Sequence, residues 1–233
     1  MRKALLSLAP LVPLLALACK TVTLQIPEAD QVRAERELSG QQRFLRVAVY
    51  VGPLWRDTDK VLVTDRPTSE IDIVEEPNGK PIFPPKPERI LPPGTPMKIR
   101  DIEFPSTFTV NQRVLVSPRY CPWVYLSVAG DQRSYVIVLP QEVKSFEDVR
   151  LELERYLTPD DPSPALAALP PDVRDLVLKK EVGPGMSARA LEMAWGLPER
   201  KRVDRPAGTE EWFWAGGKRH AYLRDDRVEK IDR

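Results

Sequence analysis

The stretch VGPGMSARALEMAWGLPER, Val182 to Arg200, decides how the C-terminal part of the chain folds. Ser187 is suited to cap a helix, and the methionine before it and the leucine four positions after it can form a hydrophobic staple. Gly196 stands where a left-handed residue ends a helix, and the proline that follows blocks continuation. We therefore expect a helix over residues 188–195 with both ends specified.

The two glycines at the start of this stretch, Gly183 and Gly185, raise the alternative of a phosphate-binding loop. The dinucleotide fingerprint requires a third glycine and a strand directly before it. Here the third glycine is absent, and a helix over 172–180 is expected to precede the loop. We predict that the glycines turn the chain between two helices.

Strand-like residues follow. In TEEWFW the two tryptophans fall on one face and the phenylalanine on the other, AGGK is suited to a hairpin turn, and RHAYLRD and RVEKI complete a predicted three-strand meander. A small domain needs large side chains to bury enough area, so core packing is favoured for the aromatics, with a peptide-binding face as the alternative. These aromatic residues are Trp195, Trp212, Phe213, Trp214 and Tyr222.

From about Leu176 to Ile231 the chain resembles the SmpA/OmlA-like domain of bacterial outer-membrane lipoproteins. The resemblance rests on Gly-Met-Ser, a short helix, Gly-Leu-Pro, Trp-Phe-Trp, a turn, an aromatic strand and DDRVEKI. It implies the fold and a place in the envelope. The best-known member of that family is the small lipoprotein subunit of the β-barrel assembly machine. There the domain follows soon after the lipidated cysteine, whereas about 160 residues intervene here.

The first nineteen residues, MRKALLSLAPLVPLLALAC, have the layout of a secretory signal, with two basic residues before an apolar run. The run is too short and too interrupted by proline to span a bilayer comfortably. LALAC, which ends at Cys19, resembles a bacterial lipobox, so we expect lipid attachment to Cys19, palmitate included. In the sorting rule of such lipoproteins, aspartate after the cysteine retains the protein at the inner membrane, so the resemblance together with Lys20 implies the outer membrane. The alternative is an ordinary signal peptide cleaved after Ala18.

Composition excludes several classes of function. The net charge is +1 and becomes −1 without residues 1–18, which leaves no electrostatic footprint for nucleic acid. If Cys19 is acylated, Cys121 has no disulfide partner, and we expect it to be a buried, inert thiol. The lone His220 lacks the spaced ligands of a metal site. With no catalytic motif present, we predict that the protein is not an enzyme and uses no cofactor or metal.

Residues from about Arg43 to Pro140 are rich in β-branched and aromatic runs separated by turn residues, which is typical of strands. Eight of the twenty residues from Pro77 to Pro96 are proline, which predicts a long extended surface loop. LPPGTPMKIRDIEFP followed by VLVSPRYCPWVYLSV looks like a bacterial SH3-like barrel. A helix capped by Ser145 should follow.

The predicted fold class is α+β, with an N-terminal SH3-like small β-barrel or sandwich and a C-terminal domain of two helices and a three-strand meander. The predicted segments are a signal peptide over 1–18, a lipidated cysteine and tether over 19–41, a β-domain with its Pro-rich loop (77–96) and trailing helix over 42–158, a Pro-rich linker over 159–171, and the SmpA/OmlA-like domain over 172–233.

These features predict a lipid-anchored, non-enzymatic protein that acts as an interaction or scaffold module in an outer-membrane-associated complex. The expected partners are the membrane and envelope proteins, with no nucleic acid. The alternative is a module that binds cell-wall peptide or glycan, with peptidoglycan as partner, because SH3-type domains use aromatic-lined grooves. The candidate binding surface is Trp55, Tyr120, Trp123 and Tyr125.

Overall fold

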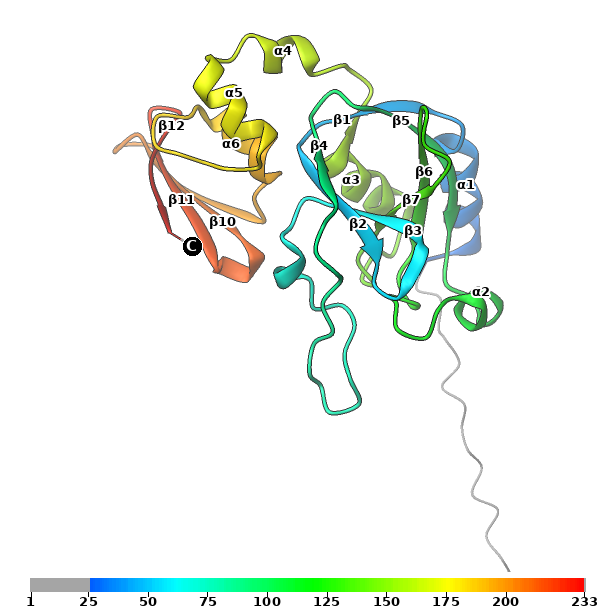
Figure 1. The fold of residues 1–233 in the computed structure, drawn as a ribbon. Helices are drawn as coiled ribbons and strands as arrows, with labels where there is room; N and C mark the ends of the chain where they lie inside the picture. The colour runs from blue at the N-terminus through cyan, green and yellow to red at the C-terminus, as the bar shows by residue number, and fades with distance from the viewer. Residues whose placement is uncertain (1–25, 233) are drawn as a thin grey trace, which may run out of the picture.

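The computed structural model describes residues 26–232 (Figure 1), so the predicted signal peptide, the lipobox and Cys19 lie outside the described residues. Two α+β units are present, one built on an eight-stranded sheet and the other on a four-stranded sheet. Within the described range, none of the helices has the length and apolar character needed to cross a bilayer.

The large sheet has the strand order β4-β2-β3-β7-β6-β5-β1-β8. All its neighbouring strands are antiparallel except β3 and β7, which are parallel and pair Leu62 with Val136. The strands are β1 (Gln42–Leu45), β2 (Val49–Leu54), β3 (Asp57–Thr64), β4 (Arg89–Leu91), β5 (Pro96–Glu103), β6 (Trp123–Val128), β7 (Ser134–Val138) and β8 (Leu157–Thr158).

Two helices, α1 (Glu28–Leu38) and α3 (Phe146–Tyr156), pack on one face of this sheet and bury its main core. Ser145 caps α3 by accepting a hydrogen bond from the Asp148 N–H, as expected. A smaller core on the other face is covered by the segments around Ile71 and Cys121. Short helices η1 (Thr68–Glu70) and α2 (Thr107–Gln112) lie in the connections.

Three features of this domain differ from expectation. The SH3-like barrel is not confirmed, because the relevant residues contribute β4, β5 and β6 to one large mixed sheet. Residues 28–38 lie in the predicted tether, where the sequence also allows a short helix over 29–38, and they form α1. Unlike a tether, this helix is part of the core, because Ala34 is fully buried. The Pro-rich stretch is a loop for most of its length, but β4 within it pairs with β2 at the sheet edge, where missing donors are tolerated.

The C-terminal unit contains α4 (Ser163–Ala167), α5 (Pro171–Leu178) and α6 (Ala188–Trp195), followed by the antiparallel sheet β12-β11-β10-β9. Helix α6 has the predicted ends, since Ser187 accepts a hydrogen bond from the Ala190 N–H and Gly196 has a φ of 86°. The expected three-strand meander is wrong by one strand. Residues 200–204, which are almost all charged, form an additional exposed edge strand. The four strands are β9 (Arg200–Asp204), β10 (Thr209–Trp214), β11 (Arg219–Arg224) and β12 (Arg227–Asp232).

The two units meet in a polar seam around Ala48, in the connection between β1 and β2. The Ala48 N–H donates to the Met193 carbonyl at 2.7 Å, and the Ala48 carbonyl accepts from the Lys180 ammonium at 2.6 Å. Ion pairs flank this contact, with Arg66 at 3.3 Å from Glu199 and Arg219 at 3.0 Å from Glu70. These contacts join residues more than a hundred positions apart and fix the two units against each other.

Candidate functional site

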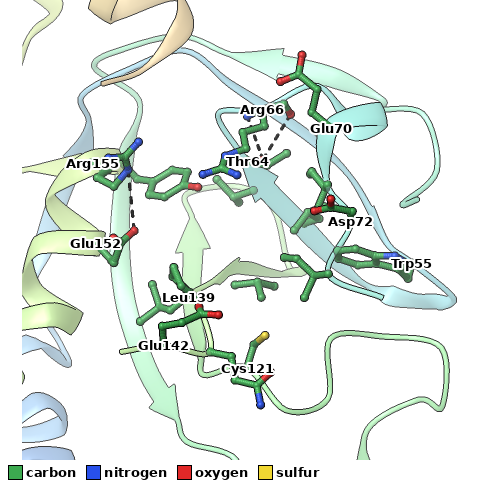
Figure 2. A pocket seen from close by; sticks show the side chains of 18 residues that line it. Trp55, Thr64, Arg66, Glu70, Asp72, Cys121, Leu139, Glu142, Glu152 and Arg155 are labelled. Atoms are coloured by element: carbon green, nitrogen blue, oxygen red, sulfur yellow. Dashed lines mark hydrogen bonds and ion pairs between the residues drawn. The ribbon is translucent and has the colours of Figure 1, made fainter. Parts of the chain in front are cut away.

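A pocket of about 510 Å³ opens where the parallel strands β3 and β7 end (Figure 2). Because parallel neighbours end at the same edge, Thr64 at the end of β3 lies beside the segment that follows Val138. The C-terminal half of α3 and the segment after η1 close the other sides. The volume lies in the range of small-molecule and peptide-anchor pockets, about 300–1,000 Å³.

The floor of the pocket is apolar. Leu62, Ile71 and Leu139 are buried side chains that line it. Trp55 also lines the pocket, and this residue is only 2% exposed. Its indole N–H donates to the Ile82 carbonyl at 2.6 Å and so connects the Pro-rich loop to the sheet. A ligand entering the pocket would therefore meet these apolar side chains at the base and polar groups on the walls.

Two guanidinium groups at the pocket are already engaged. The Arg66 guanidinium pairs with Glu199 of the second unit, and the Arg66 backbone N–H donates to the Thr64 hydroxyl at 3.1 Å. Arg155 donates to the Leu197 carbonyl at 2.9 Å and lies 3.9 Å from Glu152. Both arginines link the pocket wall to the second unit.

Two carboxylates at the rim have no ion-pair partner in the part of the chain that the structure describes. Asp72 and Glu142 are exposed, and neither forms an ion pair with another described residue. Burial raises the pKa of Glu152, and Arg155 only partly opposes this effect. The pocket therefore has apolar side chains at its base and the exposed carboxylates of Asp72 and Glu142 at its rim. This arrangement suits a ligand that has an apolar group next to a positively charged group.

Cys121 also lines the pocket, and it is the free thiol of the described residues. Burial raises its pKa to about 12, and Arg113 opposes this only in part. The thiolate is the nucleophilic form of cysteine, so this thiol is protonated and unreactive near neutral pH. The prediction that this thiol is buried is confirmed, and its inertness stays a prediction.

The four predicted binding residues do not form one exposed surface. Trp55 and Trp123 are buried, and Tyr120 is 48% exposed. The Trp123 indole N–H donates to the Pro118 carbonyl at 3.1 Å, and its ring lies 6.2 Å from Tyr125, edge to face. Trp123 and Tyr125 thus stiffen the sheet, and of the four only Trp55 lines the pocket.

Sequence reasoning missed Arg66, Asp72, Glu142 and Glu152 as pocket residues. They come from four separate segments, and the pairing of β3 with β7 brings those segments together. No local pattern in the sequence predicts the pairing of β3 with β7.

In the second unit, Trp195, Trp212 and Trp214 pack together in the core, with the Trp195 and Trp214 rings edge to face at 5.2 Å. The core interpretation of these tryptophans is confirmed. His220 is half-buried on the other face of the sheet, where Nδ1 lies 3.1 Å from Glu211 and the ring meets Phe213 edge to face at 4.6 Å. Across residues 26–232, histidine, cysteine and carboxylate side chains form no cluster of three that could hold a metal ion.

Comparison with known proteins gives no family assignment, since no protein-family model, curated protein or solved structure matches this chain.

Proposed function

We propose that the protein is a lipid-anchored, non-enzymatic component of the bacterial envelope that acts as an interaction module in an outer-membrane-associated complex. The lipobox-like sequence at Cys19 and the SmpA/OmlA-like pattern of the C-terminal residues support the location. The pocket in the first unit supports the activity, and we assign to it a peptide segment of a partner protein.

The observation that carries this proposal is the combination of an apolar floor with free carboxylates at the rim. An apolar side chain of the partner would lie over Ile71 and Leu139, and a neighbouring lysine or arginine would reach Asp72 and Glu142. Pockets of this size typically use apolar walls for affinity and a few placed polar groups for specificity. Opposite charges on the partner would also raise the association rate.

A binding role fits the polar groups better than a reaction does. The cysteine at the pocket is held protonated by burial. The arginines are held by Glu199 and by the Leu197 carbonyl. An enzyme site usually needs a nucleophile or base poised near the working pH, and these groups are arranged to hold the pocket wall instead.

Site-specific photo-crosslinking in cells tests the proposal. A photoreactive amino acid at the exposed rim residue Gln141 should capture an envelope protein, whereas the same probe at the exposed Arg205 of the β9–β10 turn should not. The double variant Asp72→Asn, Glu142→Gln should reduce capture at Gln141 about tenfold while leaving thermal unfolding unchanged. The proposal fails if capture at Gln141 is absent, or if it survives this neutralisation.

A second candidate is cell-wall peptide or glycan, because all the residues that line the pocket belong to the β-domain, for which the sequence predicts ligand binding of the SH3 type. Sedimentation with purified peptidoglycan separates the two candidates. Saturable binding that is lost in the Asp72→Asn, Glu142→Gln variant would favour the cell wall. Trp123→Ala is a poor probe, because removing a fully buried tryptophan costs about 3–5 kcal/mol of stability.

A further inference from the structure

An unusual composition marks the segment that contains α2. Residues 104–130 include no aspartate or glutamate, although 30% of the whole chain is charged. Within this segment four large apolar side chains are exposed, out of ten such side chains among the described residues. We call them the apolar tip: Phe108 (70% exposed), Val114 (37%), Leu115 (78%) and Tyr120 (48%).

The backbone beneath the apolar tip is firmly held. Ser106 and Thr109 form a capping box at the start of α2. The buried Arg113 donates to Glu103 at 2.8 Å and to the Cys121 carbonyl at 2.7 Å, and its guanidinium lies 3.9 Å from the centre of the Trp123 ring. The side chains of the apolar tip are therefore exposed on a backbone that is held in place by the capping box and by the hydrogen bonds of Arg113.

The charges around the tip are also unusual. Arg113 is paired with Glu103, while the Arg119 guanidinium donates to the Val110 carbonyl and has no carboxylate partner among the described residues. The other exposed residues of α2 and its following turn, such as Asn111 and Gln112, are uncharged. A segment that exposes aromatic and aliphatic side chains, contributes no carboxylate of its own and carries Arg119 outside any ion pair of the described residues suits the interface of a bilayer with anionic lipids.

The position of the tip relative to the expected anchor points to the same partner. Figure 1 shows α2 at the end of the large sheet where the described chain begins. Ile26 is the seventh residue after Cys19, so the chain between them can span at most about 25 Å. A lipid on Cys19 would therefore bring this end of the molecule, and not the second unit, to the membrane surface.

We propose that the apolar tip is a second membrane contact, with Phe108, Leu115 and Tyr120 inserted into the interfacial region of the leaflet that holds the lipid anchor. This inference rests on the proposed anchor at Cys19. One flexible tether alone leaves a protein free to tumble at the surface. A second contact fixes its orientation, and the two together would hold the second unit away from the membrane.

Fluorescence quenching on vesicles tests the tip. The lipidated full chain carrying Leu115→Cys, labelled with an environment-sensitive fluorophore, is reconstituted in vesicles of phosphatidylethanolamine and phosphatidylglycerol that contain a nitroxide-bearing lipid. Because Cys121 is buried and protonated, labelling is confined to the introduced thiol. The matched control is Val203→Cys, an equally apolar and 50% exposed position on β9 of the second unit.

We expect quenching at position 115 to exceed that at 203 at least about threefold, and to fall to the level at 203 when Phe108→Ser and Tyr120→Ser are added. Equal quenching at positions 115 and 203, in protein that floats with the vesicles, would overturn the membrane contact. The apolar tip would then be exposed for contact with another protein. Protein that does not float with the vesicles overturns the anchor and the tip together, so the two failures are distinguishable.

Discussion

Lys180 is a buried cation at the seam between the two units, and its removal gives the sharpest test of how they are joined. Its ammonium donates to the Ala48 carbonyl at 2.6 Å and to the Ala194 carbonyl at 2.7 Å, and lies 5.1 Å from the centre of the Tyr50 ring. Burial lowers the pKa of Lys180 to about 7, Asp65 opposes this and Arg219 adds to it. A neutral amine still has two hydrogens for the two carbonyls, so the contact survives deprotonation.

This pKa makes the free energy of unfolding depend on pH in a definite direction. In the unfolded chain the lysine pKa is about 10.4. Between pH 7 and pH 10 the unfolded state therefore holds a proton that the folded state has lost, and stability rises with pH by up to about 1.4 kcal/mol per unit. Below pH 7 both states are protonated, and this contribution is flat, with the cost of burying the charge fully present.

The variant Lys180→Met lacks this titration. We expect the difference in unfolding free energy between wild type and Lys180→Met to change by about 3–4 kcal/mol in favour of wild type from pH 7 to pH 10. The measurement is urea denaturation over that range. Lys179→Met is the matched control, because Lys179 is exposed, and its difference from wild type should stay nearly constant. Parallel pH profiles for wild type and Lys180→Met would show that Lys180 does not lose its proton in the folded protein over this range.

Two further predictions concern the seam and the pocket. Gly196→Ala should lower the free energy of unfolding by about 2–4 kcal/mol and Gly185→Ala by only about 1–2 kcal/mol, measured by urea denaturation. Both glycines have a φ of 86°. A Cβ at Gly196 would lie 2.6 Å from the Asp65 carboxylate, whereas a Cβ at Gly185 would meet nothing within 4 Å. Equal losses would contradict the close approach of the two units. At pH 8 the thiolate fraction of Cys121 should be about a thousandfold lower than that of an ordinary cysteine. The thiol should therefore react with a disulfide reagent only after unfolding. Rapid labelling of the folded protein would show that the thiol is accessible.

Local signals account for the elements that the sequence predicts well. The serine cap and the glycine with positive φ define the ends of α6 without any tertiary information, and the structure has both. Met186 and Leu191, the predicted staple pair, are both buried in the core of the second unit. The turn at Asp225 and Asp226, both with positive φ, likewise separates the last two strands where expected. Each of these depends on contacts within a few residues.

The missed features depend on contacts that are remote in sequence. Strand β9 is almost entirely charged and exposed, so it carries no apolar alternation and is defined only by pairing with β10. The parallel pairing of β3 with β7 joins residues more than seventy positions apart and creates the pocket edge. Trp55 and Trp123 were candidates for a groove, but aromatic residues in strands serve cores and grooves alike, and only burial distinguishes the two.

The proposed function depends first on whether Cys19 anchors this protein to the envelope. Metabolic palmitate labelling of the full-length chain in a bacterial host, beside Cys19→Ala and with membrane fractionation, tests it most directly. We predict label on the wild type alone, in the outer-membrane fraction. Unlabelled wild-type protein in the soluble periplasm would contradict the claim and move a soluble ligand-binding role to first place.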